Sequence, residues 1–405
     1  MPLNAELLFT KALFGGIINT LTRKGARRSM KNKKLGIYIH IPFCIRKCNY
    51  CDFCSFPDAS GSLMESYTAA LCKKIRNFAP LAQEYSIDTV YFGGGTPTLL
   101  SAELFEKILS VLFSEYDIEG DAEISCECNP ASIDAYGLGA LRKMGINRLS
   151  IGLQSANENE LRALGRVHSF EDFKRTFREA RAAGFDNISA DLMYGIPHQT
   201  EESFRHTLHS LVELSPEHIS AYGLKIEDGT AFARTADTLP LPDEDVEYNM
   251  YCLLTELLEN HGYRRYEISN FAKKGFESRH NMRYWQRGEY IGFGVAAHSF
   301  FGGERFGNSR DISAFIRGED IVCEREVLTD NDLLDEYIML SLRLSSGLRR
   351  GEFQRLSGKT VEDAFPQLRG LVEGGFLHDD GESISFTTKG FFVSNVILAD
   401  MLNSK

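Results

Sequence analysis

Three closely spaced cysteines give this 405-residue chain its clearest chemical feature. Cys44, Cys48 and Cys51 have the spacing C-x3-C-x2-C, and Cys54 follows after two further residues. Three thiolates on one loop can bind three irons of a cubane iron–sulfur cluster, which leaves the fourth iron open for a ligand that is not protein. A structural zinc site instead uses four protein ligands. The spacing therefore predicts a [4Fe-4S] cluster with one open iron.

A zinc site is the alternative use of the same cysteines. Cys54 or His40 would then have to supply the fourth ligand. No second pair of C-x2-C cysteines stands elsewhere in the chain, which disfavours this alternative. We expect Cys54 to be a buried small residue and not a ligand.

Six short apolar runs alternate with helical patterns and must position these cysteines. The runs are rich in Ile, Val, Leu and Tyr, as buried parallel strands are. They span residues 35–41, 87–92, 122–127, 148–153, 187–193 and 218–226. Helical patterns span residues 63–78, 102–113, 133–144, 170–183 and 201–214, with Ser101, Ser132, Ser169 and Thr200 as expected caps. This order predicts an α/β fold, a partial (three-quarter) parallel β/α barrel of about six units.

Glycine and polar residues follow the predicted strands. The cysteine loop follows the first strand, and the later strand ends carry residues 93–97, 127–130, 154–155, 191 and 225–227. Because the carboxyl ends of parallel strands meet at one edge, we expect a single site there. The run Gly93–Gly95 lacks the Gly-Lys-Ser/Thr of a nucleotide phosphate loop. Its backbone can approach a small zwitterionic ligand closely, and a plain tight turn is the alternative.

The chain divides into four predicted parts. They are a basic N-terminal extension (1–34), the barrel (35–265), a connecting segment (266–328) and a C-terminal domain (329–405). The last part has three helical patterns, an Asp379-Asp380-Gly381 turn between two apolar runs, and a final helix. This pattern predicts a small winged-helix-like α+β domain. Its eight Lys/Arg and twelve Asp/Glu give a net charge of −4, which argues against DNA binding.

The charge of the whole chain is unevenly distributed. Its net charge is −11, but residues 1–34 hold eight Lys/Arg and one Glu, so the remainder carries −18. An acidic body does not suit a nucleic-acid partner. The basic extension is either a weak contact with an anionic membrane surface or a solvated tail. Nine cysteines, an odd number, without a secretory signal predict a reducing, cytoplasmic location.

The connecting segment holds a second group of candidate residues. His280 is followed closely by Tyr284 and by Trp285, the only tryptophan. An imidazole beside aromatic rings can bind a haem, and a hydrogen-bonded packing histidine is the equal alternative. The string from Gly292 to Ala297 matches the G-x-G-x-x-A dinucleotide pattern, but no helical pattern follows it. We interpret it as a close-packed turn.

These motifs resemble the radical S-adenosylmethionine (SAM) superfamily over residues 35–405. The resemblance implies that the open iron binds the amino and carboxylate groups of SAM, which is cleaved to a 5′-deoxyadenosyl radical. It assigns the SAM contacts to Tyr38, Tyr50, Gly94, Gly95, Thr96, Glu127, Gln154, Arg166 and Asp191. Arg166 would bind the carboxylate and Asp191 the ribose hydroxyls, which suits a cation and an acid.

Within the superfamily, the chain is similar to the branch of oxygen-independent coproporphyrinogen III oxidases (HemN) and HemW heme chaperones. HemN enzymes carry a fourth cysteine two residues after the third, where this chain has Phe53. The string from His280 to Trp285 looks like HemW, which implies haem binding at His280, Tyr284 and Trp285 and delivery to an unknown acceptor protein. The expected function is that of a heme chaperone with a [4Fe-4S] cluster and SAM. The alternative is oxidative decarboxylation of coproporphyrinogen III to protoporphyrinogen IX.

Overall fold

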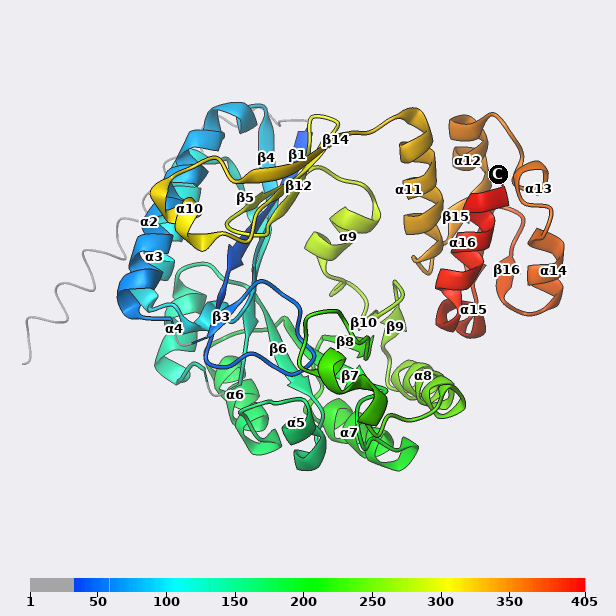
Figure 1. Ribbon diagram of the computed structural model, residues 1–405, viewed down its shortest axis with the longest axis horizontal. Helices are drawn as coiled ribbons and strands as arrows, with labels where there is room; N and C mark the ends of the chain where they lie inside the picture. The colour runs from blue at the N-terminus through cyan, green and yellow to red at the C-terminus, as the bar shows by residue number, and fades with distance from the viewer. Residues whose placement is uncertain (1–32, 58, 131, 405) are drawn as a thin grey trace, which may run out of the picture.

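The main body is one 12-stranded sheet that curves into an open barrel, with helices along its outer face (Figure 1). The computed structural model describes residues 33–57, 59–130 and 132–404. Seven adjacent strands run parallel, in the order β11-β1-β4-β5-β6-β7-β8. Their bounds are β1 (Lys33–Ile41), β4 (Tyr85–Gly94), β5 (Ile118–Cys128), β6 (Arg148–Gln154), β7 (Ile188–Tyr194), β8 (His218–Gly223) and β11 (Tyr290–Phe293). Over the described residues the sheet keeps two free ends, which confirms the predicted α/β class with a partial parallel barrel.

Amphipathic helices cross over between the parallel strands and bury one face on them. They are α2 (Gly61–Phe78), α3 (Ala102–Glu115), α4 (Ala135–Lys143), α5 (Glu158–Ala163), α6 (Phe170–Ala182), α7 (Glu201–Leu214) and α8 (Glu244–Asn260). Ser101, Ser169 and Thr200 cap their helices as predicted. Ser132 does not, because α4 begins later and Asp134 accepts the Gly137 N–H. The Ser132 hydroxyl donates to the Asn129 carbonyl instead, at 2.6 Å.

Alternation along the strands separates the core from the barrel interior. In β1 the side chains of Leu35, Ile37, Ile39 and Ile41 are fully buried under the helices. The residues between them point inward, and the register sets Tyr38 beside Tyr91 of β4. Burial of the apolar set fixes this register, because a slip of one residue would turn every polar side chain into the helical layer.

The end of the predicted barrel part and the connecting segment add strands at both ends of the sheet. β9 (Arg264–Arg265) and β10 (Asn270–Ala272) extend the β8 side, and β10 is antiparallel to β8. β12 (His298–Phe301), β13 (Glu304–Asn308) and β14 (Val322–Val327) extend the β11 side as an antiparallel ladder. Between them, α9 (Arg279–Trp285) returns to the barrel, and α10 (Ile312–Arg317) packs near α2 (Figure 1). Gly294, with φ +108°, makes the turn after β11, where a Cβ would lie 2.4 Å from the Tyr67 hydroxyl.

A separate C-terminal layer of helices and a small sheet lies beside the barrel (Figure 1). Its strands are β15 (Leu348–Arg349), β16 (Leu377–Asp379) and β17 (Ser383–Phe386), in the order β15-β17-β16. Its helices are α11 (Asp330–Leu342), α12 (Arg350–Ser357), α13 (Val361–Ala364), α14 (Leu368–Glu373), α15 (Thr388–Phe392) and α16 (Ser394–Ser404). The predicted turn at Asp380 and Gly381 joins β16 to β17, where the Asp380 carboxylate accepts the Ser383 N–H at 2.7 Å.

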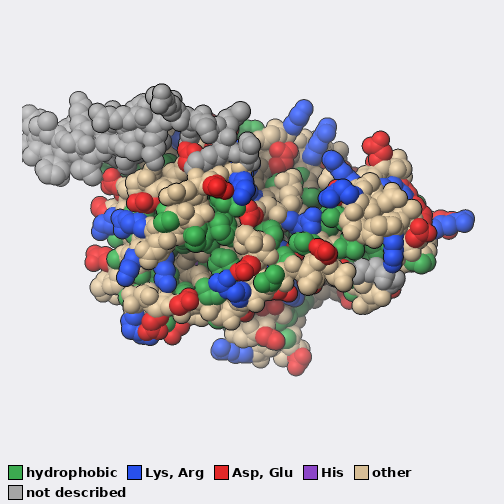
Figure 2. All heavy atoms as spheres, turned by 90° about the horizontal axis from the view of Figure 1, so that it is seen from above, with side chains coloured by type: hydrophobic (Ala, Val, Ile, Leu, Met, Phe, Trp, Pro, Cys, Tyr) green, Lys and Arg blue, Asp and Glu red, His purple; other side chains and the backbone are tan. Residues whose placement is uncertain are grey.

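Charged side chains of both signs are interspersed on the face shown in Figure 2. None of the helices in the described part of the chain is long and apolar enough to cross a membrane. The predicted membrane-surface contact falls almost wholly on residues 1–32, which lie outside the described residues. Lys33 and Lys34, the last cations of that predicted extension, belong to β1 and form ion pairs with Glu84 and Glu119.

Candidate functional site

A cavity of about 470 Å³ opens at the carboxyl ends of the parallel strands. Its lining includes eleven of the predicted cluster and SAM residues: Cys44, Cys48, Tyr50, Cys51, Gly94, Gly95, Thr96, Glu127, Gln154, Arg166 and Asp191. Five strands or the loops after them (β1, β4, β5, β6 and β7) supply ten of these groups, and Arg166 follows α5. The residues that were predicted at the strand ends therefore line one concave cavity.

The three cysteines line this cavity as half-buried free thiols. The Thr96 hydroxyl donates to Cys44 Sγ at 3.7 Å, and Arg166 Nη1 donates to Cys48 Sγ at 3.6 Å. Burial raises the pKa of Cys44, and the Thr96 hydroxyl partly offsets this rise. No three His, Cys, Asp or Glu side chains in the described ranges converge on one metal position. A cubane does not require such convergence, because each thiolate binds a different iron, so the donor set suits a three-cysteine cluster.

Backbone hydrogen bonds hold the cysteine loop against the strand ends. The Gly95 N–H donates to the Ile41 carbonyl at 2.9 Å, and the Thr96 N–H donates to the Phe43 carbonyl at 2.7 Å. Asn49 fixes the middle of the loop, since its N–H donates to Leu164 O at 3.0 Å. A loop fixed at several points loses little entropy when a cluster binds.

We expect Gly95→Ala to displace the cysteine loop. A Cβ at Gly95 would stand 2.6 Å from the Phe43 carbonyl oxygen, which is too close for carbon. The predicted result is a loss of about 2 kcal/mol in the free energy of unfolding, as for other overpacked sites, and less than half of the normal cluster iron. Chemical denaturation and iron analysis measure the two effects. Gly139→Ala is the matched control, because nothing lies within 4 Å of that Cβ, and equal effects of the two substitutions would contradict the prediction.

Glu127 presents a carboxyl group at the centre of the cavity. Its Oε1 accepts the Tyr91 hydroxyl at 3.0 Å, and its Oε2 accepts the Gly94 N–H at 3.1 Å. Burial away from water, followed by the charge of Asp191, raises the pKa of Glu127 from 4.5 to about 7. At neutral pH this group can therefore either accept a hydrogen bond from a ligand hydroxyl or donate its own proton.

This raised pKa predicts a pH-dependent stability. Between pH 4.5 and pH 7 the folded chain keeps the Glu127 proton, whereas the unfolded chain loses it, so stability falls as the pH rises through this window. Glu127→Gln removes the titration, and its amide can still pair with Tyr91 and Gly94. Between pH 5 and pH 8, we expect the free energy of unfolding to fall by about 2 kcal/mol less in the variant than in the parent chain. This difference is somewhat smaller than the full linkage value, because the cavity admits water. Urea unfolding of the cluster-free proteins at both pH values tests this, and equal changes would disprove it.

Asp191 and Arg166 face the cavity from neighbouring elements. Asp191, in β7, accepts the Ser150 hydroxyl at 3.0 Å, and burial raises its pKa. Arg166 follows the end of α5, and its Nη2 donates to Asn129 Oδ1 at 2.8 Å and to the Gly152 carbonyl at 3.1 Å. A Cβ at Gly152 would lie 3.0 Å from Nη2 of this guanidinium, closer than an ordinary contact. The acid and the cation thus lie ready for hydroxyl and carboxylate groups respectively.

Gln154 ends β6 in a left-handed conformation, with φ +70°. Such a backbone costs free energy in a residue other than glycine and is frequent at ligand sites. Tyr50 also lines the cavity and packs beside a small apolar cluster of Leu164, Met193, Ile196 and Phe232. Tyr38 is the exception among the predicted SAM residues, because it does not line the cavity. Its hydroxyl pairs with His40 Nδ1 at 3.0 Å, and its ring stacks on Tyr91.

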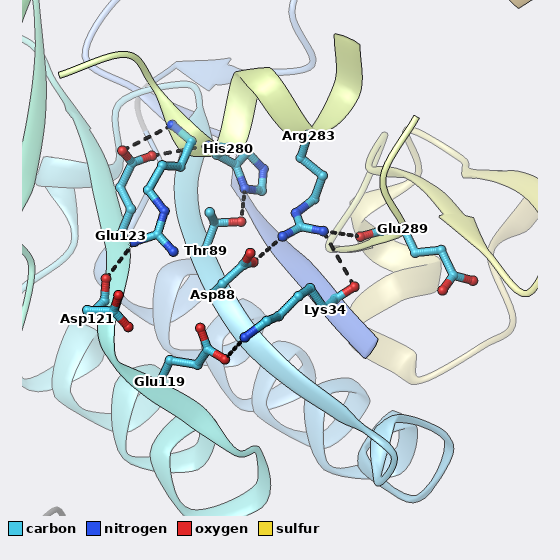
Figure 3. Close-up of polar contacts among 10 residues, drawn as sticks. Lys34, Asp88, Thr89, Glu119, Asp121, Glu123, His280, Arg283 and Glu289 are labelled. Atoms are coloured by element: carbon cyan, nitrogen blue, oxygen red, sulfur yellow. Dashed lines mark hydrogen bonds and ion pairs between the residues drawn. The ribbon is translucent and has the colours of Figure 1, made fainter. Parts of the chain in front are cut away.

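His280 is buried at the start of α9 and does not line the cavity, and Figure 3 shows its ring directed to Thr89. Its Nδ1 pairs with the Thr89 hydroxyl at 2.9 Å, and its Nε2 pairs with the Tyr284 hydroxyl at 2.7 Å. Burial, together with Arg283 and Arg148, lowers the pKa of His280 to about 3, so the ring is neutral. With both nitrogens paired and 1% of the residue exposed, this arrangement does not support the predicted role of His280 as a haem ligand.

Tyr284 follows His280 into this buried cluster. Its ring lies edge-on to those of His280 and Tyr290, and Trp285 is half-buried at the end of α9. None of the three haem candidates lines the cavity. The geometry instead suits the alternative in which the residues from His280 to Trp285 are packing residues that hold α9 against the barrel strands.

Polar contacts tie α9 to three strands of the barrel (Figure 3). The Glu123 carboxylate of β5 accepts the Arg279 and His280 N–H groups, both at 3.2 Å. Arg283 forms an ion pair with Asp88 of β4 and donates to the Lys34 carbonyl of β1. These bonds hold Asn281, on the same helix, at the cavity wall.

The sequence reasoning missed Arg148 and Asn281, which line the inner end of the cavity. Arg148 is 1% exposed, and its Nε has no hydrogen-bond partner among the described residues. The negative charge of Glu123 is the main interaction that stabilises the buried positive charge of Arg148. A signal did exist for Arg148, because it shares the inward-facing alternation of Ser150 and Gln154 along β6. No periodicity pointed to Asn281.

Cys54 lies apart from the three cavity cysteines. The residue is 7% exposed, belongs to the apolar core, and is absent from the cavity lining. Its carbonyl accepts the His40 ring at 2.8 Å. This position suits the predicted packing role.

Comparison with known proteins adds independent information. The Radical SAM superfamily model matches residues 38–211, and the HemN C-terminal domain model matches residues 328–393. Heme chaperone HemW of Bacillus subtilis (strain 168) is 35% identical over 376 residues, covering 90% of this chain and 98% of that protein. Heme chaperone HemW of Escherichia coli (strain K12) is 34% identical, covering 91% and 98%. The structure of coproporphyrinogen III oxidase (HemN) from Escherichia coli superposes with a TM-score of 0.81 at 25% identity, covering 96% of this chain and 93% of that one.

Proposed function

Because the chain belongs to the HemW heme chaperone family of radical SAM proteins, we propose that it binds haem and transfers it to an acceptor protein, with a [4Fe-4S] cluster and SAM as cofactors. The observation that carries the proposal is the similarity to heme chaperones along nearly the whole of both chains. Haem carriage in a reducing compartment such as the cytoplasm accords with the free cysteines of the chain.

The cavity residues have separate tasks in this proposal. Cys44, Cys48 and Cys51 would hold the cluster, and the donors Thr96 and Arg166 would stabilise the thiolates. When bound and reduced, the cluster supplies the electron that cleaves the SAM sulfonium.

The other polar groups would orient SAM. Arg166 donates to Cys48 Sγ at 3.6 Å, beside the expected cluster, and would pair with the SAM carboxylate. Asp191 and Glu127, half-buried acids with raised pKa values, would accept hydrogen bonds from ribose hydroxyls.

Oxidative decarboxylation of coproporphyrinogen III is the second candidate function. The fold shared with HemN and the SAM-sized cavity beside three cysteines favour it. Against it stands the residue two positions after Cys51, which is Phe53 where the sequence of HemN enzymes has a cysteine.

One anaerobic reconstitution separates the two functions. The cluster-loaded protein is titrated with haem while the Soret band is recorded, and a parallel sample receives reductant, SAM and coproporphyrinogen III. We expect stoichiometric haem binding and no decarboxylated product, in an assay where a coproporphyrinogen oxidase is active. Absence of haem binding would refute the chaperone proposal, and protoporphyrinogen IX formation would establish the enzyme.

A further inference from the structure

The mouth of the cavity carries exposed apolar side chains beside the cluster cysteines. Ile45 is 48% exposed and Phe53 is 64% exposed, and both belong to the cysteine loop. Tyr222, at the end of β8 on another side of the cavity, is 43% exposed. Phe53 and Tyr222 line the same cavity, whereas Ile45 does not line it but lies between the lining residues Cys44 and Arg46 in the sequence. Apolar side chains gathered around one opening mark a ligand or partner contact more often than scattered ones do.

Basic side chains surround this apolar group. Arg46, Lys47 and Lys225 line the cavity mouth, and Arg310 reaches the loop by donating to the Asp52 carbonyl at 3.4 Å. Lys225 is paired with Glu227 at 2.6 Å, whereas Arg46 has no ion pair among the residues that the structure describes. Four cations and two acids, Asp52 and Glu227, thus stand at this opening, in a chain whose net charge is −11.

A flat apolar ring with carboxylates at one edge complements such a surface. Haem has this chemistry, and its propionates would be attracted to guanidinium and ammonium groups while its ring contacts an aromatic side chain. The buried His280, with both nitrogens paired, offers no comparable surface. Because these cations are exposed, an acceptor protein could reach haem that is bound to them, and transfer of haem requires such access.

We propose that haem binds at the cavity mouth, with its ring on Phe53 and Ile45 and its propionates directed to Arg46 and Lys47. The inference rests on the proposed haem-binding function and names the site of that function. A ligand in this position covers the opening of the cavity behind it. Bound haem therefore slows the exchange of SAM, and the two ligands leave in a fixed order, haem first.

The test compares haem with haem dimethyl ester, whose propionates carry no charge. Phe53→Ser is expected to weaken both ligands about ten-fold, because it removes apolar contact. Arg46→Glu is expected to weaken haem about ten-fold and the ester less than two-fold. Leu81→Ser, equally 64% exposed but outside the cavity, and Arg369→Glu, on the C-terminal domain, are matched controls expected to have no effect. Cluster iron is measured in every variant, so that a disturbed loop is recognised.

The outcomes distinguish this site from the function itself. If the parent chain binds haem and both mouth variants bind it equally well, the mouth is not the site and the chaperone function stands. If the parent chain binds no haem, the proposed function fails first. If Arg46→Glu weakens haem and the ester to the same extent with its cluster intact, the propionate contact is wrong.

Discussion

Cys48→Ala is expected to abolish the iron–sulfur cluster, whereas Cys54→Ala is expected to retain it. Cys48 lines the cavity beside Arg166, and its loss would leave two thiolates, too few to hold the cubane. Cys54 lies in the apolar core, where alanine removes only one sulfur atom. Iron analysis after anaerobic reconstitution should give about four irons per chain for the Cys54 variant and a small fraction of that for the Cys48 variant.

The same pair of variants tests the assignment of three ligands. Cys126→Ala serves as a second control, because that thiol is fully buried in β5. A Cys54 variant that folds normally but loses its cluster would show that four cysteines bind the metal. In that case the open iron, and with it the expected SAM site, would have to be abandoned.

His280→Ala is expected to lower the free energy of unfolding by about 3 kcal/mol and to change haem affinity by less than two-fold. The substitution removes a buried ring stacked on Tyr91 and leaves the Thr89 and Tyr284 hydroxyls without their partner. Losing two buried hydrogen bonds and creating a cavity accounts for an effect of this size. Denaturant unfolding measures the free energy of unfolding. A haem titration at a denaturant concentration well below the unfolding midpoint, where the variant is folded, measures the haem affinity.

Thr89→Val provides the matched control for this prediction. It removes one of the same hydrogen bonds without touching the imidazole, and should cost about 1 kcal/mol. If His280→Ala abolished haem binding while Thr89→Val did not, and if both chains were folded, His280 would be a haem ligand after all. The buried geometry would then describe only the haem-free state.

Much of the barrel could be predicted because its signals are local. A strand buried under helices must be apolar, and a parallel strand must be followed by a crossover, so runs such as residues 148–153 were recognisable in order. Polar residues at the strand ends then indicated the site. The strands β11 to β14 were not predicted, because most of them are short and contain glycine or charged residues. In addition, β11 pairs with β1, which places residues near 291 beside residues near 37.

His280 shows the limit of reasoning from residue type. Its neighbours Tyr284 and Trp285 suggested an aromatic haem pocket, and nothing in the chain signalled that Thr89, 191 positions earlier, would occupy its Nδ1. Ser132 failed as a cap partly for the same reason, because its hydroxyl pairs with that of Thr98, 34 positions earlier, and also with the nearby Asn129 carbonyl. Side-chain partners distant in sequence decide such roles.

The sequence by itself indicated the three cysteines as a candidate cluster site and the order of the parallel strands, since spacing and alternation depend only on nearby residues. The expected SAM contacts followed from the resemblance to a family. The tertiary structure alone decided which of these groups share one cavity. It set Tyr38 and His280 outside the lining of that cavity, Arg148 at its inner end and Phe53 at its mouth. The physical reason is that burial and hydrogen-bond pairing depend on the packing of all elements together, and that packing is not encoded in any single motif.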